Sequence, residues 1–300
     1  MAPHKNVTIA LTFDFDAYST WIGTFGATSP SMLSRGEFGP VGVRRIQALL
    51  KRYDAKGTFF TPGHTALAFP DHVRELVDNG HEIGHHGWVH ENPITLAPDE
   101  ERAVLERGLE ALDKIAGVRP VGYRSPAWDN SPSTIPLLLE MGFEYESSMM
   151  GADFTPYWCR IGDEWSTTEE YRFGKPVDLV EVPVAWHLDD WPYFEFVVTP
   201  MGTTTGLRNP NDPLTVWKEE FDYLYQNIGA GLLTITMHPQ VIGRGYRMLM
   251  LERFLEHVVK HEGVSFSTCD AYTRQWRKGK TPSLPDGAGP ARSRAWDSTL

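Results

Sequence analysis

Short apolar strands and amphipathic helices alternate along most of this 300-residue chain, and this alternation restricts its fold more than any other feature. The run Val7–Asp14 is β-branched and nearly continuously apolar at its start, which is typical of a strand buried on both faces of a parallel sheet. Val41–Tyr53 has helical spacing, and Gly57–Phe60 after it is again strand-like. Repeated strand–helix units predict an α/β fold built on a parallel sheet.

The alternation continues toward the C-terminus without a break in composition. We expect further helices at residues 69–79, 98–117, 133–141, 214–226 and 248–261. We expect further strands at residues 81–85, 121–124, 179–184, 232–237 and 264–267. Seven or eight such units predict a single-domain β/α barrel over residues 1–277, with an open doubly wound sheet as the alternative.

Three stretches do not fit this alternation. Ala17–Pro40 is rich in Gly, Ser and Thr, and Gly151–Pro176 is rich in aromatic and charged residues. Both follow predicted strands, so we expect both to lie over one end of the barrel and to narrow its mouth. Residues 278–300 are rich in Pro, Gly, Ser, Ala and Arg without periodicity, which predicts a disordered tail or an arm on a neighbouring copy.

Composition excludes several classes of function. The net charge of −11 has the wrong sign for a nonspecific binder of nucleic acid or of an anionic membrane. No run approaches the roughly 18 uncharged apolar residues of a membrane helix, and the N-terminus does not resemble a signal peptide. Cys159 and Cys269 have no paired spacing, so we expect neither disulfides nor a cysteine zinc site, and a cytoplasmic location.

Polar side chains gather where the predicted strands end, which is where β/α barrels form their active sites. Asp14 and Asp16 end the first strand and, two residues apart, project to the same face. Two carboxylates held that close need a cation or a proton between them. Later strands end near His86, Arg124 and His238. From position alone, helix capping remains an alternative for the aspartates and His238, and a surface partner for Arg124.

His86 and His90 have a spacing that can bring two imidazoles to one ion. Two imidazoles and one carboxylate leave a fourth position open for water, as catalytic zinc requires. Asp16 lies nearer the strand end and is the expected ligand, whereas Asp14 lies deeper. We interpret His81 and His85 as structural, because strand parity points both away from His86.

Four segments resemble, in order, the motifs of the polysaccharide deacetylase family, carbohydrate esterase family four. These segments are Thr12–Asp16, Gly84–His90, Tyr123–Trp128 and Leu233–Pro239, and the resemblance covers roughly residues 7–275. It implies a distorted β/α barrel that removes acetyl groups from N-acetylated sugars with a divalent metal. The resemblance implies that Asp16, His86 and His90 bind the metal. It implies that Asp14 is the base, that Arg124 holds this base in place and that His238 is the acid. Trp128 would help to place the substrate carbonyl.

Further candidates surround this set. Asp189 or Asp190 could orient His238, and we prefer Asp190. Tyr123 and Trp88 are further candidates for substrate binding, since several aromatic residues near strand ends could stack on a sugar or on a flat ring.

One departure from the family pattern concerns the substrate. Phe15 separates Asp14 from Asp16, whereas the family has two adjacent aspartates followed by glycine. The segments His86–Pro93 and Ser34–Gly39 look like a subgroup with cytoplasmic-type peptidoglycan deacetylase homologues, cyclic imide hydrolases and a metal-independent allantoinase. Members of that subgroup act on small cyclic amides or ureides.

We therefore expect a hydrolase of non-peptide carbon–nitrogen bonds that uses a divalent metal ion, most favourably Zn²⁺. The expected substrate is a small or terminal amide, imide or N-acetyl sugar. The alternatives are a metal-free ureide hydrolase of the allantoinase type and a non-catalytic carbohydrate-binding barrel. We expect a small-molecule or sugar partner, no nucleic acid and no membrane. Assembly into a homo-oligomer is compatible with the sequence.

Overall fold

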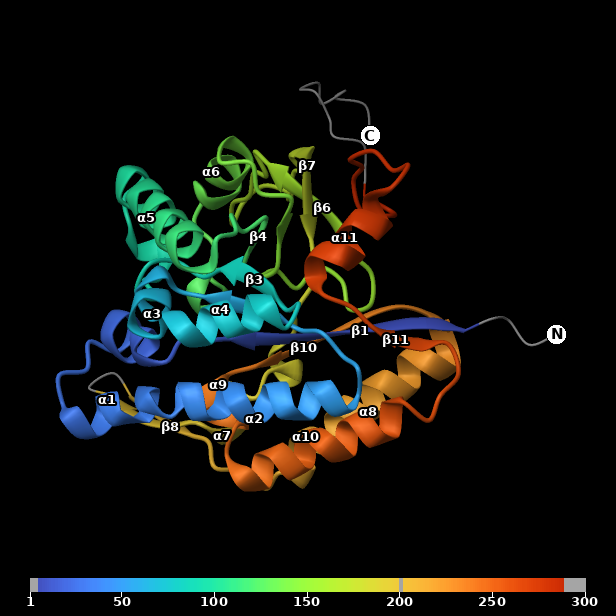
Figure 1. Ribbon diagram of the computed structural model, residues 1–300. Coiled ribbons are helices and arrows are strands. Elements are labelled where there is room, and N and C mark those ends of the chain that lie inside the picture. The colour runs from blue at the N-terminus through green and yellow to red at the C-terminus, as the bar shows by residue number, and fades with distance from the viewer. Residues whose placement is uncertain (1–4, 200–201, 289–300) are drawn as a thin grey trace, which may run out of the picture.

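A curled, mostly parallel sheet forms the centre of the computed structural model, which describes residues 5–199 and 202–288 (Figure 1). Its strands follow the order β10 (Ala230–Met237), β1 (Asn6–Asp14), β2 (Thr58–Thr61), β3 (Glu82–His85), β4 (Gly122–Tyr123), β5 (Tyr145–Glu146), β7 (Lys175–Glu181) and β6 (Tyr157–Ile161). A short strand, β11 (Val264–Phe266), pairs with the first half of β1. All of these pairings are parallel except that of β6 with β7.

The helices lie mainly on the outside of this sheet (Figure 1). They are α1 (Pro30–Glu37), α2 (Gly39–Arg52), α3 (Gly63–Ala68), α4 (Pro70–Asp78), α5 (Pro98–Ala116), α6 (Thr134–Glu140), α7 (Trp191–Phe194), α8 (Asn211–Tyr223), α9 (Pro239–Ile242), α10 (Gly245–Val258) and α11 (Cys269–Arg277). Short π or 3₁₀ turns are η1 (Thr20–Thr24), η2 (Pro93–Thr95), η3 (Pro126–Trp128), η4 (Trp186–Leu188) and η5 (Leu224–Ile228). No helix in the described part of the chain is long and apolar enough to cross a bilayer.

The sheet curls into a half-open barrel. Its hydrogen-bonded order ends at β6 and at β10 within the described residues. Two contacts bridge this gap, a hydrogen bond of 2.9 Å from Leu232 N to Phe154 O and an isolated β-bridge between Asp189 and Thr236. The α/β class and the distorted barrel are confirmed, and the distortion lies at this unpaired seam.

Local sequence explains why the elements begin and end where they do. In α5, Pro98 occupies the first turn, and the Glu100 carboxylate accepts a hydrogen bond of 2.9 Å from Ala97 N. The helix ends at Gly117, whose φ of 66° is the left-handed conformation that glycine adopts without strain. In β1 every residue after Asn6 is buried, and Phe13 stacks on Phe59 with ring centroids 4.7 Å apart.

Two buried carboxylates are linked through Ser148 to the segment after β4 that contains Arg124 and Ser125. Glu146 on β5 lies opposite Glu181 on β7, and both are fully buried. Ser148 N donates to both carboxylates at 3.1 Å, and the Ser148 hydroxyl donates to Glu146 while accepting from Ser125 N. Burial and the charge of Glu146 raise the pKa of Glu181 well above its usual value.

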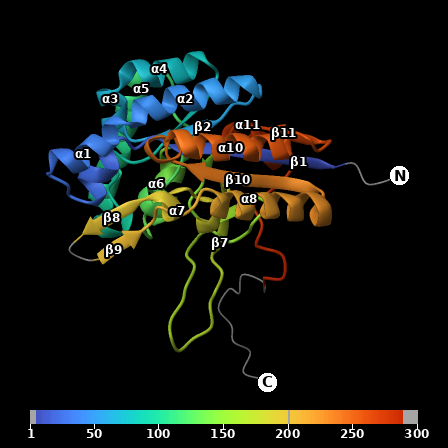
Figure 2. The same ribbon diagram turned by 90° about the horizontal axis from the view of Figure 1, so that it is seen from below.

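The expectation for Gly151–Pro176 is wrong in part. Residues 157–161 form β6 and residues 175–176 begin β7, and the loop between these strands projects away from the body of the molecule (Figure 2). An antiparallel pair of strands, β8 (Phe196–Thr199) and β9 (Gly202–Thr205), forms a separate hairpin that the alternation did not predict. Residues 278–288 form neither helix nor strand, and residues 289–300 of the predicted tail lie outside the described residues.

Candidate active site

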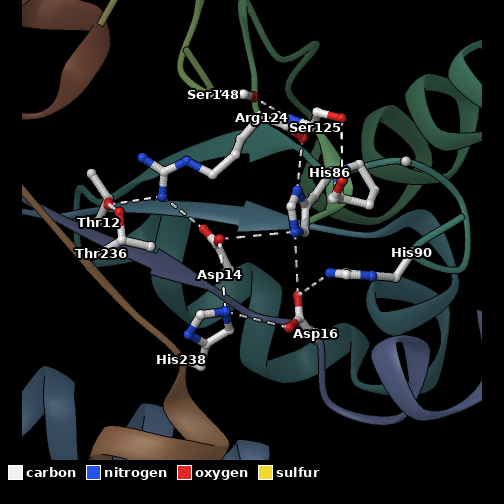
Figure 3. A network of polar contacts seen from close by, with 12 residues as sticks. Thr12, Asp14, Asp16, His86, His90, Arg124, Ser125, Ser148, Thr236 and His238 are labelled. Carbon is white, nitrogen blue, oxygen red and sulfur yellow. Dashed lines mark hydrogen bonds and ion pairs between the residues drawn. The ribbon is translucent and has the colours of Figure 1, made fainter. Parts of the chain in front are cut away.

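The carboxyl ends of β1, β3, β4 and β10 bring six predicted site residues together (Figure 3). These residues are Asp14, Asp16, His86, His90, Arg124 and His238, and all six are buried. The parallel register explains the convergence, because β1 pairs with β10 on one side and with β2 on the other, and β2 continues the sheet to β3. Residues far apart in sequence therefore reach one edge of the sheet.

Asp14 forms an ion pair with the fully buried Arg124, with 2.8 Å between Oδ1 and Nη1. The guanidinium is fixed by further bonds to Thr12 Oγ1 at 2.8 Å, Ser147 Oγ at 2.9 Å and Ser147 O at 3.0 Å. Burial raises the pKa of the Asp14 carboxyl, but Arg124 and the neighbouring imidazoles outweigh that effect and leave the pKa below its usual value. The geometry holds Asp14 ionised and in one orientation.

Asp16, His86 and His90 form a second group, in which one ligand atom of each lies within 4.8 Å of the other two. Asp16 Oδ1 lies 3.5 Å from His86 Nε2 and 3.8 Å from His90 Nε2. Donors on a tetrahedral zinc-like ion lie about 3.3 Å apart, so the group matches such an ion closely. Asp16 Oδ1 and His86 Nε2 are buried and have no hydrogen-bond partner among the described residues.

The hydrogen bonds of Nδ1 in each imidazole show that Nε2 is unprotonated and has a free lone pair. His86 Nδ1 lies 2.7 Å from Arg124 O, which can only accept, so Nδ1 carries the proton. His90 Nδ1 lies 2.5 Å from Thr24 Oγ1, whose own proton goes to His90 O at 3.0 Å, so this Nδ1 is also the donor. Burial lowers the pKa of His86 to about 4 and that of His90 well below its usual value. Neutral imidazoles with Nε2 unprotonated are the form that binds a metal, so these three residues fit a divalent cation.

A close backbone approach places Thr24 beside His90. Gly23 in η1 lies against the 86–90 turn, and a Cβ at this position would come 1.8 Å from Val89 O. His90 itself has a φ of 65°, an uncommon conformation for histidine. A larger residue at position 23 would separate η1 from the turn that contains His86 and His90.

His238, which directly follows β10, faces the two aspartates. Its Nε2 lies 3.9 Å from Asp14 Oδ2 and 3.9 Å from Asp16 Oδ2. Its Nδ1 lies 2.7 Å from Asp190 Oδ1 and 3.6 Å from Asp189 Oδ1, so the nearer orienting carboxylate is that of Asp190. Burial lowers the pKa of His238, but Asp189 and Asp190 outweigh it and raise the pKa well above its usual value.

A pocket opens above this polar floor, with a cavity volume of about 120 Å³. Its walls include two aromatic pairs, Trp128 with Trp186 at 4.4 Å between ring centroids and Phe25 with Trp191 at 6.1 Å. The φ of 54° at Trp128 is strained for a tryptophan and holds this ring at the pocket. The aromatic walls suit a flat amide or the face of a sugar ring.

Two predicted substrate-binding residues lie elsewhere. Tyr123 is buried in a hydrophobic cluster and packs against His85 and Phe143, outside the pocket lining. Trp88 is half-buried under Arg107, whose guanidinium carbon lies 3.7 Å from the ring centroid, and it does not line the pocket either. His85 is fully buried, and its Nε2 lies 3.0 Å from Leu105 O. These contacts give His85 a structural role in the packing of the core.

Several residues that line or support the site could not be predicted from the sequence. Thr20, Thr24 and Phe25 come from η1 and its flank, and Gln240 Nε2 donates to Asp16 Oδ2 at 3.3 Å. Residues 17–40 therefore cover the pocket as expected, but residues 151–176 do not line it, and the 186–191 segment takes that place. No periodic signal marks η1 or Gln240, although Gln240 lies only two residues after His238.

Comparisons with known proteins agree with this geometry. The sequence profile of the family Polysaccharide deacetylase matches residues 2–145. A curated peptidoglycan deacetylase of Helicobacter pylori is 39% identical over 276 residues, which cover 88% of this chain and 94% of that protein.

Solved structures show the same fold. A Mycobacterium smegmatis structure described as a polysaccharide deacetylase has a TM-score of 0.82 and 35% identity, with 95% of each chain covered. An allantoinase structure has a TM-score of 0.75 at 24% identity, with 93% of each chain covered, and shows the fold alone. The extent of these matches and the buried Asp-His-His group lead to one conclusion: the chain belongs to the polysaccharide deacetylase family and is a hydrolase of carbon–nitrogen bonds other than peptide bonds.

Proposed function

We propose that this hydrolase uses a divalent metal ion, with Zn²⁺ preferred, to remove the acetyl group from a small or chain-terminal N-acetyl sugar. The observation that carries the proposal is the unpartnered pair Asp16 Oδ1 and His86 Nε2, buried 3.5 Å apart beneath a small aromatic pocket. The curated relative of H. pylori, named a peptidoglycan deacetylase, supports an N-acetylated glycan as the substrate.

Asp16, His86 and His90 would hold the ion, which lowers the pKa of a bound water to about 7 and polarises the amide carbonyl. Asp14 lies beside this group, with Oδ2 3.9 Å from His86 Nε2. Because Arg124 keeps Asp14 ionised, its free oxygen can accept the proton that the attacking water gives up.

His238 serves the opposite half of the reaction. Amide nitrogen leaves poorly unless it is protonated, and His238 Nε2 faces the pocket while Nδ1 is held by Asp190. The carboxylates behind the ring keep it protonated, so Nε2 can donate its proton to the departing nitrogen.

The size of the pocket favours a small or terminal substrate. Residues from η1, η3 and η4 close in around a cavity of about 120 Å³, room for one acylated group or one small ring. Trp186 is 46% exposed at the rim and can stack on the sugar that carries the acetamido group.

The test is a substrate panel assayed with the apoenzyme and with added zinc. N-acetylglucosamine and its oligomers should release acetate only with metal, and the short oligomers should turn over at least as fast as long ones. His86→Ala and His90→Ala should each lose metal and activity together, whereas His72→Ala, a half-buried histidine outside the site, should change neither. Unchanged metal content and rate in both site variants would refute the proposal.

A second candidate substrate is a small cyclic imide or ureide. The parallel rings of Phe25 and Trp191, tilted by only 8° from each other, favour a flat ring. Succinimide, hydantoin and allantoin therefore belong in the same panel. Metal-independent turnover of any of them, with no acetate released from N-acetyl sugars, would replace the first candidate by this one.

A further inference from the structure

Helices α8 and α10 lie side by side (Figure 1, Figure 2). A second cluster of metal-ligating side chains lies between them, apart from the pocket lining. Asp222 is on α8, His257 is on α10 and His261 follows α10 by one turn of chain. One ligand atom of each lies within 4.8 Å of the other two, and all three residues are half-buried. We propose that Asp222, His257 and His261 bind a second divalent transition-metal ion of the zinc type.

The hydrogen bonds leave suitable atoms for this ion. His261 Nδ1 lies 3.1 Å from His257 O, a pure acceptor, so Nδ1 carries the proton and Nε2 keeps its lone pair. His257 Nε2 lies 2.6 Å from Asp222 Oδ1, so these two atoms share a proton. The two imidazoles come from positions four residues apart, and the carboxylate comes from the facing helix, which together make an N, N, O donor set.

Binding would exchange the shared proton for the ion. Donors on a tetrahedral ion lie about 3.3 Å apart, so His257 and Asp222 must separate by about 0.7 Å. Their side chains are 22% and 33% exposed, which gives the ion access and the side chains room for this movement. The exchange releases the proton to solvent as the ion binds, so the affinity should fall at low pH.

Aromatic neighbours hold the imidazoles in place before an ion arrives. The ring centroid of His261 lies 4.9 Å from that of Phe221, 4.7 Å from that of Tyr225 and 5.1 Å from that of His257. These edge-on contacts limit rotation of the ring, so binding costs little further side-chain ordering.

The ion would tie together two helices, one of which supports a wall of the catalytic pocket. Trp217 Nε1 on α8 donates to His187 O at 3.1 Å, and Glu220 Oε1 lies 3.0 Å from His187 Nε2. His187 lies in η4 between Trp186 and the aspartates that orient His238. An ion at the second site therefore restrains the helix on which this wall rests.

The experiment measures the zinc stoichiometry and affinity of the full chain after removal of metal, by titration against a chromophoric chelator. Native protein should bind two equivalents, and His261→Phe should bind one, since phenylalanine keeps the ring packing but offers no ligand. Asp222→Asn should lower the affinity for zinc at this second site at least tenfold. His72→Phe, a half-buried histidine outside both groups, should still bind two.

Two further measurements separate this site from the catalytic one. A His86→Ala/His90→Ala variant should keep one equivalent, which cobalt should report as a visible absorption band that His261→Phe abolishes. Zinc should also raise the thermal midpoint of that variant. If native protein and His261→Phe bind the same number of zinc ions, the second site does not exist. If the catalytic group fails to bind metal, native protein binds one equivalent and His261→Phe binds none, so the two failures are distinguishable.

Discussion

Replacing Asp14 by asparagine would separate the proposed base from the proposed metal ligands, because Asp14 at the end of β1 and Asp16 just after it face different partners. Asp14 is paired with Arg124 at 2.8 Å, whereas Asp16 Oδ1 lies 3.5 Å and 3.8 Å from the imidazoles of His86 and His90. Asp14→Asn should therefore keep its metal and lose the proton acceptor. A general base contributes roughly 100- to 10,000-fold, so kcat should fall by that factor, or about 2.7 to 5.5 kcal/mol of transition-state stabilisation.

The same substitution has a cost in stability that can be worked out in advance. Breaking a buried ion pair costs about 3 to 5 kcal/mol when the remaining charge has no other partner. Arg124 keeps bonds to Thr12 Oγ1, Ser147 Oγ and Ser147 O, and the asparagine oxygen can still accept from it. We therefore expect a loss of about 3 kcal/mol or less in the free energy of unfolding, measured by urea denaturation.

Three variants and three measurements complete this test: metal content by elemental analysis, kcat at saturating substrate, and urea denaturation. Asp16→Asn should lose metal and activity together. Asp178→Asn removes the exposed partner of Arg277 at 2.6 Å and should change the free energy of unfolding by at most about 1 kcal/mol. If Asp14→Asn loses the metal while Asp16→Asn keeps both metal and rate, the roles of the two aspartates are the reverse of those proposed.

Three other substitutions and one control address the acid, the buried carboxylates and the pocket wall. Asp190→Asn should retain metal but lower kcat roughly 100-fold, because His238 loses its nearest carboxylate; an unchanged kcat would exclude this orienting role. Glu181 has a pKa raised by burial, so the folded state holds a proton that the unfolded state releases, and the free energy of unfolding should fall as pH rises from about 4.5 through that raised pKa. Glu181→Gln should flatten this decline, which reaches at most about 1.4 kcal/mol per pH unit, and parallel curves for the two proteins would contradict the assignment. Trp128→Ala should raise KM about tenfold while Tyr123→Phe leaves KM unchanged, and the reverse pattern would show that the pocket lies elsewhere.

Much of the fold could be predicted from periodicity. Long elements with one clear pattern, such as β1, α5 and β10, lie within a few residues of their predicted ranges. The strands that were missed have only two to five residues, and β5 consists of Tyr145 and the buried Glu146, which no hydrophobic pattern marks as a strand. Antiparallel β6 could not be predicted from the alternation, because parallel units with helical crossovers give no signal for a hairpin partner.

The floor of the site could be predicted better than its walls. Asp14, Asp16, His86 and His238 lie at strand ends, where the parallel sheet itself decides their convergence. Side chains such as Phe25 and Trp186 belong to short turns whose path depends on tertiary contacts, so spacing alone could not assign them. Tyr123 shows the opposite case, since an aromatic residue near a strand end is a candidate for stacking on a substrate, whereas strand parity directs this ring into the core.

The pairing of β1 with β10 has a consequence for how the protein folds during its synthesis. Asn6 pairs with Ala230 and Phe13 with Met237, so this edge of β1 gains its partner only after about 224 further residues have been synthesised, whereas β2, which pairs Thr58 with Thr12, follows much sooner. At ordinary rates of synthesis this delay is roughly 10 to 45 seconds. During that time Asp16, His86 and His90 are already synthesised, whereas His238 is not. Because His238 follows β10, the full set of site residues can come together only once β10 has been synthesised and has paired with β1.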